Sequence, residues 1–218
     1  MYGDLISLGS VCEVAYQIKL HTDKDESDYF DWLITPIAAV VFALERNFEG
    51  MFDLNDLEIF ANGEAVHNKK TGIMYLHTFP LSEDRLVLPN FRDLYPDASS
   101  KFLHFRRKFL ALKDRNDPVT FIRRDVSPEE ASLLCETIRR NFSKLKFRLI
   151  AVNVPGEYPN DGFNNDSVKQ IEVPKSGPGG LGVSEIWCQE FIRIGLVDHG
   201  FRKEYHQIVK TGKHYVFE

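Results

Sequence analysis

A cysteine lies where the sequence changes from a buried strand to an amphipathic helix. The stretch LISLGSVCEVAYQIKL, residues 5–20, contains a short apolar run, a Gly-Ser turn and then apolar residues at near-helical spacing. This pattern places Cys12 in the first helical turn, where unpaired N–H groups and a partial positive charge can lower the pKa of a thiol. Cys12 is therefore a candidate nucleophile, and the amides around Ser10 and Val11 are candidates for an oxyanion hole. The alternative is a structural thiol, because free cysteine is among the most buried residue types.

A cysteine nucleophile needs an imidazole base, which is usually distant in sequence and near in space. The chain has seven histidines. His77 ends a predicted strand over about residues 73–79, where its side chain can project toward the carboxyl edge of a parallel sheet. Ligands of open α/β sheets bind at that edge. His199, in the segment VDHG after a predicted helix, is the second candidate, and the choice between the two stays open.

Two further candidates lie in the aromatic segment DYFDWLITP. A carboxylate among aromatic rings needs a partner if it is buried, and a histidine N–H is suitable, so Asp31 is a candidate for orienting His77. Asp31 could equally cap a helix that begins near Thr35. The candidate oxyanion and substrate-binding residues are Ser10, Val11 and Trp32.

Strands and helices alternate around these residues. The clearest unit is the strand PVTFIRRD, a helix with Ser127 as N-cap and Glu130 as its capping-box partner, and the strand FRLIAVNV. Such a unit implies a right-handed parallel crossover. Further strands are expected at 5–8 and 168–174, and an edge strand or hairpin is expected within 201–218. Further helices are expected from about Pro36, over 99–113 with Ser99 and Ser100 as caps, and near 183–196. The segment KSGPGGLG is expected to be a flexible turn, because it lacks the phosphate-loop pattern.

Length and composition favour one domain. The chain has 218 residues, of which 43% are hydrophobic and 27% are charged. We expect a single three-layer α/β domain over residues 1–218, with a mainly parallel sheet flanked by helices and irregular insertions. Three separated cysteines, Cys12, Cys135 and Cys188, suggest neither a disulfide framework nor a zinc site, so no metal or cofactor is expected.

The net charge and the hydropathy of the sequence argue against nucleic-acid and membrane partners. A net charge of −5 and a pI near 5.8 argue against nonspecific binding to nucleic acid or anionic lipid. The sequence has neither a signal-peptide pattern nor an apolar run near the roughly 20 residues that span a bilayer. We therefore expect a cytoplasmic protein without a membrane or nucleic-acid partner.

Several segments together resemble a known family. The segments ISLGSVCEVAYQIK, FDWLITP and YLHTFP, followed by FRRKF leading into VTFIRRD, are similar to the DUF1796 family of papain-like cysteine peptidases. The resemblance spans Leu5 to Asp125. It implies that the cysteine of SLGxxC, here Cys12, is the nucleophile and that the histidine of H-x-F, here His77, is the base. Thr78 stands where the family often has an acidic residue.

These observations predict a cysteine-dependent hydrolase, a papain-like peptidase or amidase, that acts on a peptide or other amide through a thioester on Cys12. The first alternative is an acyltransferase that uses a thioester donor such as acyl-CoA in polysaccharide modification, because the family also resembles capsule-biosynthesis proteins and the sequence suggests no long cleft framed by two domains. The second is a noncatalytic binding module that uses the FDW cluster and the GPGG loop as its surface. A third is a serine esterase built on Ser10, Asp198 and His199.

Overall fold

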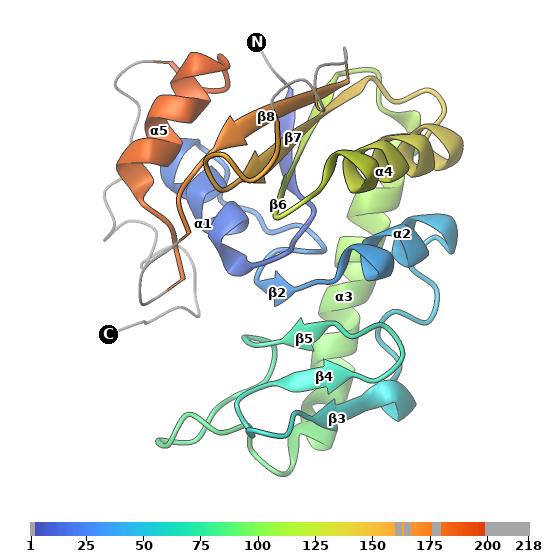
Figure 1. Cartoon of the computed structure of the whole chain (residues 1–218). Coiled ribbons are helices and arrows are strands. Elements are labelled where there is room, and N and C mark those ends of the chain that lie inside the picture. Colours follow the sequence, from blue (N-terminus) through green and yellow to red (C-terminus); the bar gives the residue numbers. More distant parts are fainter. Residues whose placement is uncertain (1–2, 160–162, 164–166, 176–179, 199–218) are drawn as a thin grey trace.

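Four parallel strands form the sheet that carries Cys12 (Figure 1). The computed structural model describes residues 3–159, 163, 167–175 and 180–198. The strand order is β1 (Asp4–Ser7), β6 (Val119–Arg124), β7 (Phe147–Asn153) and β8 (Val168–Glu172). Each neighbouring pair is parallel, so all four carboxyl ends lie at one edge of the sheet.

Helices cover both faces of this sheet. Figure 1 shows α1 (Cys12–His21) and α5 (Ser184–Arg193) on one side, and α2 (Ile37–Glu45) and α4 (Pro128–Asn141) on the other. Strand alternation explains the two layers, because successive side chains point to opposite faces. On β6, Phe121 packs with the α2 and α4 side, whereas Ile122 packs with Trp187 of α5. The expected three-layer α/β architecture with a mainly parallel sheet is confirmed.

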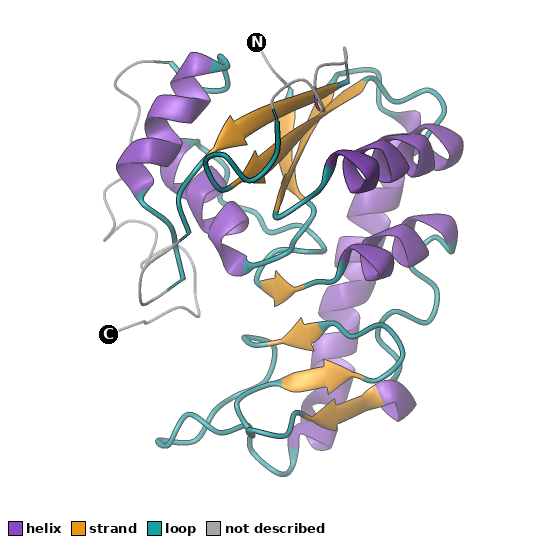
Figure 2. Ribbon diagram, viewed as in Figure 1, coloured by secondary structure: helices purple, strands orange, loops and turns teal. Residues whose placement is uncertain are grey.

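A second, antiparallel sheet lies beside the first (Figure 2). Its order is β2 (Leu33–Ile34), β5 (Met74–Tyr75), β4 (Val66–Asn68) and β3 (Leu57–Ile59). The strand expected over 73–79 is therefore shorter and pairs antiparallel with β2 and β4, not in the parallel sheet. The long helix α3 (Tyr95–Leu110) runs from this sheet to the parallel one (Figure 1). Short 3-10 helices are η1 (Leu54–Asp56), η2 (Phe91–Leu94) and η3 (Ala111–Asp114).

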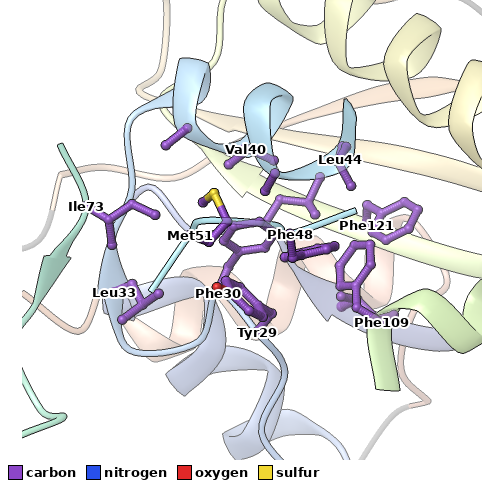
Figure 3. Close-up of a cluster of buried hydrophobic side chains, with 14 of the residues drawn as sticks. Tyr29, Phe30, Leu33, Val40, Leu44, Phe48, Met51, Ile73, Phe109 and Phe121 are labelled. Carbon is purple, nitrogen blue, oxygen red and sulfur yellow. The ribbon is translucent and has the colours of Figure 1, made fainter. Parts of the chain in front are cut away.

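Aromatic side chains join the two sheets in one core. Figure 3 shows Phe30 and Phe48 beside Phe109 of α3, which stacks on Phe121 of β6 with ring centroids 6.0 Å apart. The ring centroid of Phe48 lies 4.9 Å from that of Phe109 and 5.7 Å from that of Phe30. The same buried cluster includes Tyr75 of β5. Because the core is continuous, the antiparallel sheet is held at a fixed place against the parallel one.

The observed helix starts agree with the sequence at α1, α2, α4 and α5 and differ at α3. Cys12 is the first residue of α1, and the Ser127–Glu130 capping box of α4 is present in both directions, at 2.9 and 3.2 Å. In contrast, α3 begins at Tyr95, so Ser99 and Ser100 are not caps. The preceding turn η2 and a proline in the first helical turn fix this earlier start. The N-cap of α2 is Pro36, without a side-chain cap.

Candidate functional site

The loop between β1 and α1 brings Cys12 to the carboxyl edge of the parallel sheet. The Leu8 N–H donates to the Ile122 carbonyl at 2.9 Å, which extends the pairing of β1 beyond its last residue. Gly9 and Ser10 then both have left-handed backbone, with φ of 77° and 76°. A Cβ on Gly9 would lie 2.7 Å from the Thr35 hydroxyl oxygen, so glycine is required here. The tight turn ends at Cys12, where the helix starts.

A cavity of about 430 Å³ opens beside Cys12. Cys12 and Val11 contribute from the parallel sheet's edge, and His77 contributes from the segment after β5 of the antiparallel sheet. The apolar lining residues are Val11, Ile34, Leu76, Leu81 and Leu181, and the charged ones are Glu64 and Arg85. Residues from the edges of both sheets therefore line the site.

The Cys12 thiol is kept protonated by its surroundings. Burial is the largest cause and the negative charge of Asp31 is the second, and together they raise the pKa of Cys12 to about 12. A hydrogen bond to the backbone N–H of Cys12 itself acts in the opposite direction. The helix N-terminus thus does not produce a low thiol pKa here, because desolvation outweighs it.

His77 lies in an environment that keeps its imidazole neutral. Burial, followed by the positive charges of Arg85 and Lys101, lowers the pKa of His77 to about 4. The Trp32 ring meets the His77 ring edge-on, at 6.4 Å between centroids and 88° between planes. Neutral imidazole is the form that accepts a proton, so His77 has the protonation state of a general base at neutral pH.

Asp31 is a buried carboxyl group near the thiol. It accepts a hydrogen bond from the Asp28 backbone N–H at 3.0 Å. Burial and the neighbouring charge of Asp28 raise the pKa of Asp31 to about 7. The negative charge of the ionised Asp31 carboxylate opposes a second negative charge on the thiol and so helps to raise the pKa of Cys12. Asp31 does not cap α2, and its orientation of His77 stays a prediction.

The alternatives built on other residues receive less support. The Ser10 hydroxyl donates to Asp125 at 3.4 Å, and Asp198 is exposed at the end of the described region. His199 lies outside the described residues, as does most of the GPGG segment. Phe30 is fully buried and Trp32 is 8% exposed, so the FDW cluster belongs to the interior and offers little surface to a partner.

Sequence reasoning missed two buried arginines at the end of β6. Arg124 forms an ion pair with Glu13 at 2.9 Å, and the Trp187 indole N–H donates to the same carboxylate oxygen at 2.7 Å. Arg123 donates to backbone carbonyls on the other side. The signal was a pair of arginines inside an apolar strand, VTFIRRD, because arginine is almost never fully buried unless it is paired.

A family comparison covers this region. The family described as "Putative papain-like cysteine peptidase (DUF1796)" matches residues 4–155, which is more than half of the chain. The chain belongs to this family. The DUF1796 match includes Cys12 and His77 together with β1, α1 and β2 to β7, and it ends before β8 and α5. The expected resemblance is therefore confirmed.

Other comparisons add little about the reaction. A protein of Acanthamoeba polyphaga mimivirus, "Uncharacterized protein R408", is 24% identical over 146 residues, which is 58% of this chain and 64% of the relative. The chain thus spans less than two thirds of the length of this relative. No solved structure matches the DUF1796 chain.

Two further properties concern the part of the chain that the structure describes. No helix there is long and apolar enough to cross a membrane. Within the same residues, His, Cys, Asp and Glu side chains form no group of three that could hold a metal ion.

Proposed function

We propose that this protein is a cysteine-dependent hydrolase that cleaves an amide or ester bond through a thioester on Cys12. The observation that carries the proposal is that Cys12 and His77 line one cavity from two different sheets. The DUF1796 membership supports the same chemistry at the level of the family. Noncatalytic binding would give no reason for a thiol and a neutral imidazole to share a cavity.

The first half of the reaction forms the thioester. The neutral His77 imidazole takes the thiol proton of Cys12 as the sulfur bonds to the substrate carbonyl carbon. The amides near Val11 and Cys12 donate to the resulting oxyanion. When the tetrahedral intermediate collapses, the bond to the leaving amine or alcohol breaks, and that group receives the proton from the His77 imidazolium.

The second half releases the acyl group. A water molecule gives a proton to His77 and attacks the thioester carbonyl. The carbon–sulfur bond then breaks, and the departing sulfur takes the proton from the His77 imidazolium, which regenerates the Cys12 thiol and releases a carboxylic acid. Because the thiol and the imidazole both rest in their neutral forms, proton transfer accompanies attack. We infer that Asp31 keeps the thiol protonated until substrate enters.

The lining of the cavity indicates the class of acyl group. Ile34, Leu76 and Leu181 provide apolar walls near Cys12. A volume of about 430 Å³ is within the range of small-molecule sites, roughly 300–1,000 Å³. We therefore propose that the substrate places an apolar acyl group in this cavity.

The test uses para-nitrophenyl butyrate as the acyl donor. Wild type should release a burst of para-nitrophenol and carry a butyryl group on the Cys12 peptide. Cys12→Ala should abolish both, and His77→Ala should slow the burst by about 100-fold or more, the size of a general-base effect. Cys188→Ala, which removes another half-buried thiol, and His67→Ala, which removes a histidine on β4, should leave the burst unchanged.

The same experiment distinguishes the alternatives. Acylation that survives in Cys12→Ala would contradict the proposal. Acyl transfer and hydrolysis share the Cys12 thioester and differ only in the acceptor. If butyrate appears only when glycerol is added, and then as a glycerol ester, the enzyme is an acyltransferase. Free butyrate in buffer alone supports hydrolysis.

A further inference from the structure

The side chain of Arg123 bridges the two parts of the protein that hold Cys12 and His77. The Arg123 side chain is buried, and 3% of the residue's surface is exposed. One guanidinium nitrogen donates to the Leu8 carbonyl at 2.6 Å, and another donates to the Thr35 carbonyl at 2.8 Å. Leu8 belongs to the loop after β1, whereas Thr35 directly follows β2 of the antiparallel sheet.

The arginine is held by carbonyls in place of a carboxylate. Within the described residues, Arg123 forms no ion pair, and its buried Nε has no hydrogen-bond partner. The charges of Glu130 and Asp125 act on it only electrostatically, and burial lowers its pKa to about 10. Burying a cation without a paired carboxylate is costly, and the two hydrogen bonds to carbonyls offset part of that cost. The buried position of Arg123 therefore depends on these two carbonyls.

Each of the two carbonyls is connected to one half of the site. Leu8 precedes the turn that starts α1 at Cys12, and the Thr35 N–H also donates to the Ser10 carbonyl at 3.1 Å. On the other side, Ile34 pairs with Met74 of β5, and His77 follows that strand by two residues. A planar fork that spans both carbonyls therefore fixes the Cys12 loop relative to the strand pair that leads to His77.

We propose that Arg123 is the positioning residue that sets His77 against Cys12. The proposal rests on the proposed function, because it assigns Arg123 an effect on the Cys12–His77 reaction. Lysine cannot replace the fork, since its single ammonium does not present two parallel donors. Loss of either hydrogen bond from Arg123 would leave Cys12 and His77 present but displaced from each other, and a displacement of about 1 Å between reacting groups can slow catalysis strongly.

A double-mutant cycle tests this role with the para-nitrophenyl butyrate burst. Burst rates are measured for wild type, His77→Ala, Arg123→Lys and the double variant, together with urea denaturation of each. Arg123→Lys should slow the burst by about 10-fold or more. His77→Ala should then slow the burst by a smaller factor in that background than in wild type, because the base is already displaced from Cys12.

The neighbouring arginine provides the matched control. Arg124 is equally buried on the same strand and also donates to backbone carbonyls, those of Val173 and Pro174, on the side of α5. Arg124→Lys should lower the free energy of unfolding. In the Arg124→Lys background, His77→Ala should nevertheless slow the burst by the same factor as in wild type. A purely structural Arg123 would behave in the same way, so an undiminished His77 effect in Arg123→Lys overturns the inference.

Failure of the two proposals is distinguishable. If His77→Ala leaves the wild-type burst unchanged, the proposed function fails, and the role of Arg123 fails with it. If His77→Ala acts strongly in wild type and equally strongly in Arg123→Lys, only the role of Arg123 fails.

A measurement on wild type makes the test independent of how variants fold. Nitrogen-15 NMR of the Arg123 guanidinium should give separate, exchange-protected signals for its two terminal nitrogens, because the two carbonyls prevent rotation. One averaged, rapidly exchanging signal would show that no clamp exists and would overturn the inference.

Discussion

Asp31 lies inside the protein, where its carboxyl group raises the pKa of the Cys12 thiol. Desolvation makes the larger contribution and has the same direction. On the other side of the site, burial and two cations lower the pKa of His77. The resting site therefore holds a thiol and a neutral imidazole, and in the proposed mechanism the substrate must draw the proton from the thiol to the imidazole.

Removing the charge of Asp31 should make Cys12 more reactive. In Asp31→Asn the thiol pKa falls toward its usual range, so the pH profile of iodoacetamide alkylation at Cys12 should shift to lower pH. Peptide mass spectrometry reads the rate at each cysteine. Cys135, whose thiol pKa is raised mainly by burial, provides the internal control and should keep its profile. An unshifted Cys12 profile would show that Asp31 does not act on the thiol.

The same substitution should change how stability depends on pH. The pKa of Asp31 is about 7 in the folded protein and near 3.8 unfolded, so between about pH 4 and 7 the folded state binds more protons. Wild-type stability therefore loses up to about 1.4 kcal/mol per pH unit from this group as the pH rises through that window. Asp31→Asn lacks this loss, and its unfolding free energy relative to wild type should increase across the window. If urea denaturation gives the same difference in unfolding free energy between Asp31→Asn and wild type at every pH, the raised pKa of Asp31 is contradicted.

Gly9 should be far less replaceable than another glycine with the same backbone. Gly9 and Gly156 have φ of 77° and 75°, but a Cβ on Gly9 would meet Thr35, whereas one on Gly156 would meet nothing within 4 Å. Gly156→Ala should cost about 1 kcal/mol of unfolding free energy from backbone strain alone. Gly9→Ala should cost more and also slow the burst, because the Cys12 loop must move. Equal losses in thermal denaturation would show that the contact with Thr35 is unimportant.

The buried pair of Glu13 and Arg124 should be sensitive to the loss of one partner. Both side chains are 2% exposed, and the Glu13 carboxylate also accepts the Trp187 indole N–H. Glu13→Gln removes the closer of the two carboxylates that pair with Arg124, leaving only Asp125 at 3.8 Å, and should lower the unfolding free energy by about 3–5 kcal/mol. Glu190→Gln, which breaks the more exposed pair with Arg193, should cost about 0–1 kcal/mol. A Glu13→Gln loss as small as that control would show that the buried pair does not stabilise the fold.

The local features of this protein were predictable from its sequence. Periodicity and turn chemistry predicted that a helix starts near Cys12, and the capping box of α4 was predicted from the spacing of Ser127 and Glu130. Both depend on residues within a few positions of each other. The alternation of β6, α4 and β7 likewise gave the parallel crossover.

The tertiary structure decided what the sequence left open. The segment 73–79 is too short for its pattern to say which sheet it joins, and only the pairing of β5 with β2 and β4 placed His77 in the lining of the cavity that Cys12 also lines. The direction of the Cys12 pKa shift was open for a related reason, because a helix start can be read locally, whereas desolvation and the charge of Asp31 act only after packing. Sequence alone determined where Cys12 sits on its helix; the fold determined what surrounds it, because burial and charge proximity arise from contacts between segments far apart in the chain.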